Sequence, residues 1–279
     1  MTALDTAVDM RTALGAVEIP SPVLTASGCS AFGRELEPFV DIAALGAVVT
    51  KSVQLRPRSG RPTPRMAETP SGMLNSIGLQ GPGIDGLLAD DLPWLAERGA
   101  RAFVSIAGTR VEHFAELAER LRGVPGVLGL EVNISCPNVE SRGEVFACDP
   151  VAAACAEAGA NGLSMINTLL GLVIDPDTMR PVLGGVTGGL SGPAIRPVAL
   201  RCVWQVHQAL PELPILGIGG IRTGLDALQF VLAGASAVSV GTAVFNDPSA
   251  VARVHDELAT ALGERGFGSL TEAVGYAHR

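Results

Sequence analysis

The sequence has few aromatic residues, few lysines and no long hydrophobic run. Only 4% of the 279 residues are aromatic, and the formal net charge is −8. That charge argues against nucleic acid as a partner, because surfaces that bind it are basic. No stretch reaches the roughly 18 consecutive apolar residues of a membrane span. Residues 1–20 carry charges and no apolar core, so we expect neither a secretory signal peptide nor a membrane anchor.

The cysteines are also sparse and irregularly placed. There are five, an odd number, and no two of them form a Cys-x-x-Cys pair. This pattern argues against a disulfide framework and against a zinc site, so we expect no bound metal. Free thiols are typical of a reducing compartment, and we expect a cytoplasmic protein. The five are Cys29, Cys136, Cys148, Cys155 and Cys202.

One local pattern recurs four times along the chain. The end of a helix is followed by Gly-Ala and then by a short apolar strand, at Gly46-Ala47, Gly99-Ala100, Gly159-Ala160 and Gly234-Ala235. Glycine just past a helix supplies the left-handed residue that ends it. Repeated helix-to-strand joins of this kind indicate a parallel sheet with crossover helices. No linker or charge run divides the chain, so we expect residues 1–279 to form a single α/β domain.

The apolar segments predict seven core strands, each followed by a polar residue or glycine. The nearest architecture is the (β/α)8 barrel, which has eight. Two long connections, 54–83 and 170–195, are expected to be irregular, and long loops in compact domains are usually functional. The expected strands are 22–26, 47–50, 102–106, 128–133, 162–166, 215–218 and 237–240. The expected helices are 39–45, 85–98 with a break at Pro93, 111–121, 150–158, 197–210, 223–232, a long one after Pro248, and a short one within 270–278.

The stretch from Leu128 to Val139 changes from apolar strand to polar loop within four residues. Asn133 lies near the strand end, and Cys136 and Asn138 follow it. Residues just past the carboxyl end of a parallel strand line the binding face of α/β proteins. Two interpretations of Cys136 remain open. It is either a reactive thiol among hydrogen-bonding neighbours or an ordinary buried cysteine, which is the commoner fate of a lone one.

Other polar residues fall at or near strand ends or in the long loop. Four of them are asparagines, namely Asn75, Asn133, Asn138 and Asn167. Their carboxamides, brought together at one site, would suit a planar polar ligand. Taken singly, such asparagines are usually turn formers. Lys51 also follows a strand, although a surface position would explain it equally well.

Glycines follow the last two strands, at Gly219-Gly220 and at Gly241-Thr242. Loops after the last two strands of a barrel commonly bind a phosphate, and glycine lets the backbone approach it closely. Each pair alone would fit an ordinary tight turn, but two pairs on adjacent strands favour the phosphate site. The four histidines fall on helices or in the tail, and we interpret them as surface or packing residues.

Five separated motifs stand out along the chain, and they are Thr50-Lys-Ser52, Asn75-Ser-Ile-Gly-Leu79, Asn133-Ile-Ser-Cys-Pro-Asn-Val139, Ile166-Asn-Thr168 and Gly217-Ile-Gly-Gly-Ile221. Together they resemble the class 1 dihydroorotate dehydrogenases, from about Met10 to the C-terminus. The segment Val145–Pro150 is more similar to class 1B than to class 1A. We expect neither the N-terminal membrane-associating segment nor the serine base of class 2.

The resemblance implies an activity, a cofactor and partners. The activity would be FMN-dependent oxidation of (S)-dihydroorotate to orotate in de novo pyrimidine biosynthesis. Cys136 would remove the proton from C5 while a hydride passes to FMN. Electrons would reach NAD through a second subunit that carries FAD and an iron–sulphur cluster, and the chain would form a homodimer.

The resemblance also assigns the site residues. Substrate would be held by Lys51, Asn75, Ser76, Ile77, Gly78, Leu79, Asn133, Asn138, Asn167 and Thr168. FMN would be held by Ala26, Ser27, Gly28, Lys51, Ser52, Asn133, Ile166, Gly192, Gly219, Gly220, Gly241 and Thr242.

The chain departs from this family in one place. Between Pro150 and Ala158 it lacks roughly thirty residues, about one βα unit with its Lys-Leu-Ser-Pro-like strand, which accounts for the missing eighth strand. Two other hypotheses therefore stay open. One is a flavin-free barrel that serves as a binding or scaffold subunit. The other is a flavin barrel similar to dihydropyrimidine dehydrogenase.

Overall fold

Seven parallel strands form the wall of an incomplete barrel. The computed structural model describes residues 7–134 and 149–279. One sheet has the order β3-β15-β14-β9 and the other has the order β4-β7-β8. The strands are β3 (Val23–Thr25), β4 (Val48–Val49), β7 (Ala102–Ile106), β8 (Val127–Val132), β9 (Leu163–Met165), β14 (Ile215–Ile218) and β15 (Ala237–Val240). All seven predicted core strands are thus confirmed.

The two sheets meet between β3 and β4. The amide of Gly46 donates to the carbonyl of Val23 at 3.1 Å, and the amide of Thr25 donates to that of Ala47 at 3.3 Å. The hydroxyl of Thr25 accepts a hydrogen bond from the amide of Val49 at 2.9 Å. The wall therefore runs in the order β9-β14-β15-β3-β4-β7-β8, which is the strand order of a barrel.

The wall is open between β8 and β9, a gap that we call the seam. In the described residues no ladder joins these two strands, so both are sheet edges. A side-chain bond crosses the seam, from the hydroxyl of Ser164 to the carboxyl of Glu131 at 2.8 Å. Every residue of β8 keeps some exposed surface, whereas the four residues of β15 are all buried. The seam lies where the sequence predicts one strand too few.

Helices cover the outside of the wall, mostly as predicted. Pro93 falls in the first turn of α2, directly after a π-helical turn, which accounts for the expected break. The helix predicted at 223–232 is confirmed as α6, and Thr223 and Asp226 form a capping box at its start. Within the described ranges, no helix combines the length and the apolar character needed to cross a bilayer. The helices are α1 (Gly83–Gly86), α2 (Leu92–Glu97), α3 (Val111–Leu121), α4 (Asp149–Glu157), α5 (Arg196–Ala209), α6 (Gly224–Leu232), α7 (Ala250–Gly263) and α8 (Leu270–Ala273).

The prediction of a helix at 39–45 is wrong. This segment forms a series of turns. The carboxylate of Asp41 accepts a hydrogen bond from the amide of Ala43 at 2.9 Å. A short polar side chain that bonds a nearby backbone amide competes with helix formation, which explains the turn.

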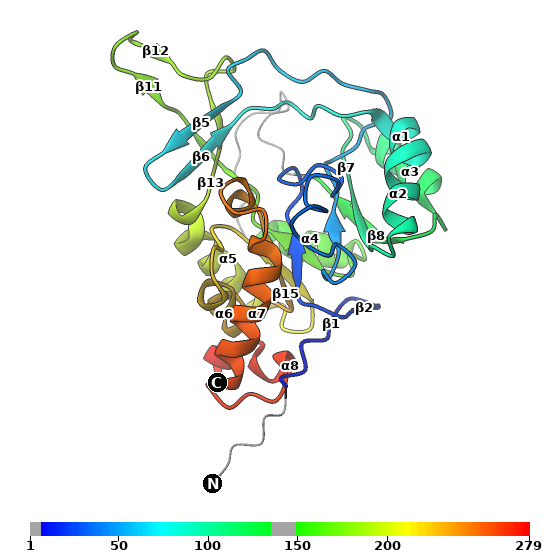
Figure 1. Cartoon of the computed structure of the whole chain (residues 1–279), viewed down its shortest axis with the longest axis vertical. Helices are drawn as coiled ribbons and strands as arrows, with labels where there is room; N and C mark the ends of the chain where they lie inside the picture. Colours follow the sequence, from blue (N-terminus) through cyan, green and yellow to red (C-terminus); the bar gives the residue numbers. More distant parts are fainter. Residues whose placement is uncertain (1–6, 135–148) are drawn as a thin grey trace.

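The two long connections are ordered, which corrects the expectation of irregular loops. They pair with each other in one antiparallel sheet, in the order β10-β13-β6-β5. The sheet lies beyond the carboxyl ends of the barrel strands (Figure 1). Its strands are β5 (Met66–Thr69), β6 (Gly72–Asn75), β10 (Leu169–Gly171) and β13 (Gly188–Ser191).

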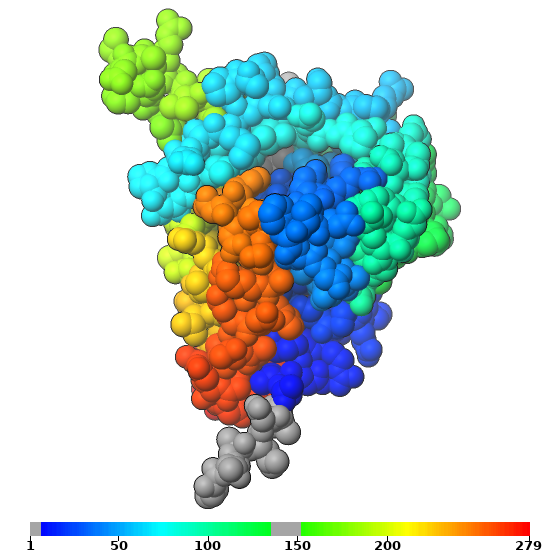
Figure 2. Space-filling view, viewed as in Figure 1, coloured from blue at the N-terminus to red at the C-terminus, as the bar shows by residue number. Residues whose placement is uncertain are grey.

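Two hairpins extend from this framework. The hairpin of β11 (Ile174–Asp175) and β12 (Arg180–Pro181) projects from the body of the molecule (Figure 2). At its tip Met179 is 83% exposed. The N-terminal hairpin, β1 (Thr12–Leu14) and β2 (Val17–Ile19), lies at the opposite end of the barrel from the antiparallel sheet (Figure 1).

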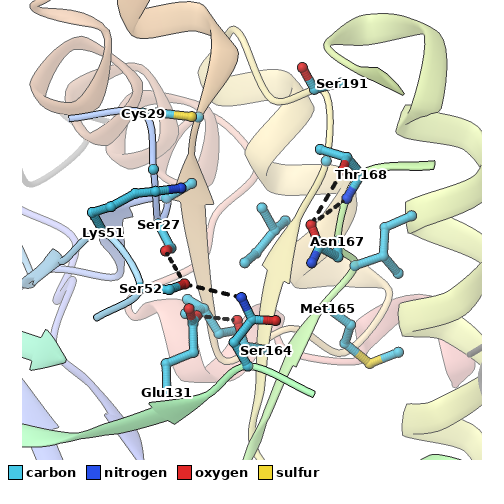
Figure 3. Close-up of a pocket in the computed structure, with 18 of the residues that line it drawn as sticks. Ser27, Cys29, Lys51, Ser52, Glu131, Ser164, Met165, Asn167, Thr168 and Ser191 are labelled. Carbon is cyan, nitrogen blue, oxygen red and sulfur yellow. Dashed lines mark hydrogen bonds between the residues drawn. The ribbon is translucent and has the colours of Figure 1, made fainter. Parts of the chain in front are cut away.

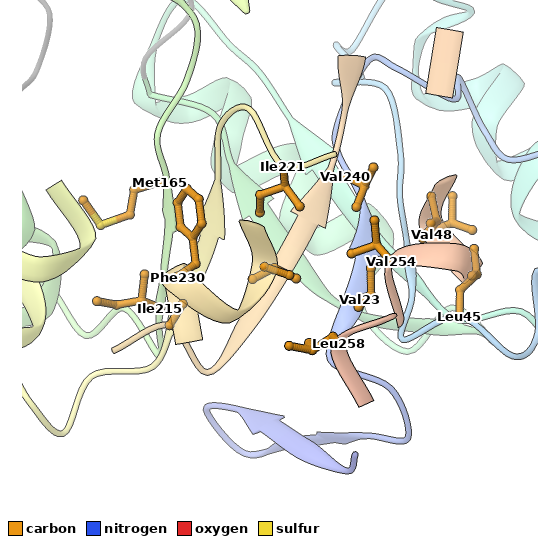
Figure 4. Close-up of a cluster of buried hydrophobic side chains, with 14 of the residues drawn as sticks. Val23, Leu45, Val48, Met165, Ile215, Ile221, Phe230, Val240, Val254 and Leu258 are labelled. Atoms are coloured by element: carbon orange, nitrogen blue, oxygen red, sulfur yellow. The ribbon is translucent and has the colours of Figure 1, made fainter. Parts of the chain in front are cut away.

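The core between wall and helices is formed by aliphatic side chains with one large aromatic ring. Phe230 of α6 is fully buried, as are Val23 of β3 and Leu258 of α7 (Figure 4). Burying one such side chain contributes about 1.5–3 kcal/mol to stability. This packing holds the strands, and with them the residues at their carboxyl ends.

Candidate active site

The carboxyl ends of the barrel strands open into one cavity below the antiparallel sheet. Its volume is about 1730 Å³. Pockets for a single small ligand measure roughly 300–1,000 Å³, so this cavity has room for more than one. It extends along the seam to Leu14 and Val17 of the N-terminal hairpin. The absence of a strand between β8 and β9 therefore enlarges the cavity.

The structure gathers almost all of the predicted site residues around this cavity. Cys136 and Asn138 lie outside the described residues. Of the remaining predicted residues, Ser76 and Gly78 do not line the cavity. Those that do are Ala26, Ser27, Gly28, Lys51, Ser52, Asn75, Ile77, Leu79, Asn133, Ile166, Asn167, Thr168, Gly192, Gly219, Gly220, Gly241 and Thr242.

Ser76 and Gly78 shape the loop that follows β6. Ser76 is fully buried, and its hydroxyl accepts a hydrogen bond from Nη1 of Arg61 at 3.0 Å. Gly78 has a φ of +77°, and a Cβ there would lie 2.7 Å from Cγ of Arg61. Both residues thus hold the loop against Arg61.

Lys51 enters the cavity from the end of β4. Its amide donates to the carbonyl of Ala31 at 2.8 Å, which fixes the backbone. Burial raises the pKa of the neighbouring Cys29 thiol to about 11, and the charge of Lys51 partly opposes this shift. No sequence pattern indicated that Cys29 would lie here.

The three described carboxamides of the cavity come from separate elements. Nδ2 of Asn75, on β6, donates to the carbonyl of Gly189 at 3.2 Å. Oδ1 of Asn167 accepts from the amide of Thr168 at 2.7 Å. Nδ2 of Asn133 donates to the hydroxyl of Ser52 at 3.0 Å. Ser52 and Asn167 both face the cavity (Figure 3). Each of the three carboxamide side chains is thus held in place by a hydrogen bond.

The two glycines after β14 lie at positions where a side chain would not fit. Gly219 and Gly220 have φ of +134° and +75°. A Cβ at Gly219 would come within 2.6 Å of Cβ of Ala199, and one at Gly220 within 2.8 Å of the carbonyl of Gly192. Nearby, Thr242 donates through its hydroxyl to that of Ser191 at 2.8 Å.

Arg222 also lines this part of the cavity. Backbone without Cβ atoms, two hydroxyls and a guanidinium make a setting that fits a phosphate. Sequence patterns did not indicate Ser191 or Arg222 as site residues.

Glu131 and Ser105 were also missed. Glu131 stands two residues before Asn133, so both side chains face the same side of the strand. Alternation along the strand therefore could have identified Glu131. Ser105 had no such signal, because it lies within an apolar strand.

The chain is thus a (β/α) barrel with glycines after its last two strands, where barrels of this kind commonly bind a phosphate. The profile of the dihydroorotate dehydrogenase family matches residues 10–152 and 143–262. Two similar proteins are named "Dihydroorotate dehydrogenase B (NAD(+)), catalytic subunit". The one from Desulforudis audaxviator is 48% identical, and the alignment covers 98% of this chain and 98% of that protein. The one from Geobacter sp. strain M21 is 46% identical, and the alignment covers 96% of this chain and 97% of that protein. The chain belongs to the dihydroorotate dehydrogenase family, which confirms the resemblance seen in its motifs.

A solved structure shows the same fold. The crystal structure of DHODH from Eimeria tenella in complex with ferulenol superposes with a TM-score of 0.80 over 97% of this chain and 89% of that one, at 22% identity. This likeness supports the barrel architecture predicted from the sequence.

The alignments also locate the missing unit. The alignment with the Desulforudis protein spans 303 positions, and the chain has 279 residues, so at least 24 positions, the difference, have no counterpart here. The two profile matches meet at residues 143–152, between β8 and β9. Both findings agree with the predicted loss of one βα unit, and the seam is its structural result.

Proposed function

We propose that this chain catalyses the FMN-dependent oxidation of (S)-dihydroorotate to orotate in pyrimidine biosynthesis. The observation that carries the proposal is the convergence, in one cavity, of Lys51, three carboxamides and a glycine cradle. Family membership supplies the reaction. The cavity supplies the groups that would bind its reactants.

The residues fit a flavin mononucleotide. Gly219, Gly220, Gly241 and Thr242 would hold its phosphate by backbone and hydroxyl groups, since a Cβ at the first two positions would clash. The flavin ring would lie toward the other end of the cavity, against the set Ala26, Ser27, Gly28, Ser52, Ile166 and Gly192. When bound, FMN supplies a hydride acceptor.

The substrate would lie among the carboxamides. Asn75, Asn133 and Asn167 offer amide donors and acceptors to a pyrimidine ring. The ammonium of Lys51 would attract the carboxylate of dihydroorotate and exclude uncharged analogues.

Cys136, which lies outside the described residues, would accept the proton from C5. A thiol with a reference pKa of roughly 8.5 needs only a modest decrease to act as a base near neutral pH. Asn138 and Thr168 would complete the contacts with the substrate.

The partners follow from the family. Its relatives are named catalytic subunits, which implies a separate electron-transfer subunit. We infer that this partner carries FAD and an iron–sulphur cluster and delivers electrons to NAD. We also infer a homodimer and a cytoplasmic location.

The absorption spectrum of the purified chain tests the proposal. We expect a flavin spectrum with about one FMN per chain, bleached by dihydroorotate under anaerobic conditions. Cys136→Ala should retain the spectrum but lose the bleaching.

Other outcomes distinguish the alternatives. A chain that stays colourless with added FMN would contradict the enzyme assignment and leave a scaffold subunit. Bleaching by dihydrouracil in preference to dihydroorotate would indicate a dihydropyrimidine dehydrogenase-like enzyme.

A further inference from the structure

The loop between β14 and α6 offers the cavity backbone donors that carry no net charge. Within the described residues, the amides of Gly220 and Ile221 donate to no backbone carbonyl. Amides of this kind can hydrogen-bond an anion. A phosphate monoester carries about 1.5–2 negative charges at pH 7, so a cation beside these amides would strengthen its binding.

Arg222 follows these amides in the chain and lines the cavity. Its backbone is held on both sides. The amide donates to Oδ2 of Asp226 at 3.0 Å, and the carbonyl accepts a hydrogen bond from Nη1 of Arg253 at 3.2 Å. The side chain of Arg222 therefore starts from a fixed point on the cavity wall.

A second arginine beside the loop, Arg196, has its charge directed elsewhere. It forms an ion pair with Asp226, and its Nη1 donates to the carbonyl of Gly220 at 3.4 Å. Arg196 is not among the described residues that line the cavity. Its role is to support the loop from behind, and its charge is already balanced by an acid.

The third arginine in this region, Arg253 on α7, is also balanced by acids. Its guanidinium lies 2.8 Å from Oδ2 of Asp247 and 2.8 Å from Oε1 of Glu257. By contrast, across residues 7–134 and 149–279 the guanidinium of Arg222 forms neither an ion pair nor a hydrogen bond, and the side chain is exposed. Arg222 is thus the arginine of this region whose charge is available to a ligand in the cavity.

We propose that Arg222 binds the phosphate of FMN and makes the chain select FMN over riboflavin. This inference rests on the function proposed above. The backbone amides and the hydroxyls of Thr242 and Ser191 would orient the phosphate, and the guanidinium would neutralise it. A planar guanidinium can donate two parallel hydrogen bonds to two phosphate oxygens, which an ammonium cannot.

The test compares two flavins that differ in the phosphate alone. The flavin-free full-length chain is titrated with FMN and with riboflavin, and the quenching of flavin fluorescence gives each Kd. Arg222→Gln should raise the Kd for FMN about tenfold, the effect of one lost charge-assisted hydrogen bond. The Kd for riboflavin should stay within about twofold of wild type. Arg222→Lys keeps the charge without the planar fork and should restore part of the affinity for FMN.

A matched control removes an arginine outside the cavity. Arg122, just after α3, is also exposed, and Arg122→Gln causes the same change in net charge. Its Kd for FMN should stay within about twofold of wild type. If Arg222→Gln weakens both flavins equally, or leaves the Kd for FMN unchanged, Arg222 does not bind the phosphate and the proposal is wrong.

Inorganic phosphate provides a readout that needs no flavin. Its phosphorus NMR line should broaden with the flavin-free wild-type chain and much less with Arg222→Gln. A wild-type chain that shows this difference, but whose flavin is not bleached by dihydroorotate, would contradict the proposed activity and leave the role of Arg222 intact. Bleaching by dihydroorotate with equal phosphate binding in both chains would do the reverse. A wild-type chain that binds neither FMN nor phosphate would overturn both proposals.

Discussion

The ammonium of Lys51 lies against the backbone of Gly28. A Cβ at Gly28 would be 3.0 Å from Nζ of Lys51, and the φ of Gly28 is +85°. Lys51 is the single lysine among 279 residues. The absence of a side chain at position 28 thus makes room for the single lysine ammonium of the chain.

Gly28→Ala should reduce activity beyond its effect on stability. The left-handed backbone would cost about 1–2 kcal/mol, and the methyl group would also displace Lys51. Gly99→Ala is the matched control, because Gly99 has a φ of +67° and no atom within 4 Å of the added Cβ. Urea unfolding should show similar losses for both variants. Only Gly28→Ala should lose kcat/KM for dihydroorotate, by about tenfold or more; equal kcat/KM in both variants would show that Lys51 tolerates the displacement.

Lys51 can be followed by chemical modification. Amine-directed reductive methylation can reach one ε-amine in this chain, so mass spectrometry should find a single modified lysine. FMN together with orotate should protect it, because Lys51 lines the cavity that they would fill. Lys51→Arg removes the reactive amine while keeping the charge, and it serves as the blank. Labelling that proceeds at the same rate with and without both ligands would place them elsewhere.

Cys29 should be unreactive at neutral pH. Its pKa of about 11 results first from burial, with an opposing effect of the Lys51 charge. At pH 8 about one thiol in a thousand would be ionised, so alkylation by iodoacetamide should be slow and should accelerate about tenfold per pH unit. Lys51→Met removes the opposing charge and should slow the reaction further. Peptide mapping of alkylated Cys29 provides the rates, and a rate typical of an exposed thiol would contradict the prediction.

Glu131 should make the protein less stable as the pH rises. Its pKa is raised in the folded state above the ordinary value of 4.5, so the folded chain binds the proton more tightly than the unfolded chain. The stabilisation is complete below about pH 4.5 and is lost as the pH rises through the folded pKa. Asp247 and Glu257 have lowered pKa values and act in the opposite direction. The difference in unfolding free energy between wild type and Glu131→Gln isolates the effect, and a difference that does not change with pH would refute it.

The barrel strands could be predicted because each is specified by nearby residues. A run such as Ala102–Ile106 is apolar, follows Gly99-Ala100 and needs no distant partner to be recognised. The same holds for the helix at 223–232, which begins at a local capping box of Thr223 and Asp226. The predicted site residues converge because the carboxyl ends of parallel strands meet at one edge of the sheet.

The antiparallel sheet could not be predicted, because its pairings join distant segments. Gly189 pairs with Asn75, which lies 114 residues earlier. Neither segment shows strand alternation on its own. Ser105 was missed for a related reason, because the hydroxyl of Ser52 that it contacts at 2.9 Å lies 53 residues earlier in the chain.

Because the wall is open at the seam, the three-stranded sheet at one end of it is held less firmly than a strand unit of a closed barrel would be. The sheet β4-β7-β8 is joined to the rest of the wall along one side only, at β3. A closed barrel would have to break pairing on both sides of such a unit to release it, whereas here one set of hydrogen bonds suffices. Hydrogen exchange should therefore show β4, β7 and β8 opening as a cooperative unit before β14 and β15. Because Lys51, Ser52 and Asn133 belong to the unit that opens first, ligand binding should protect its amides more than those of the larger sheet.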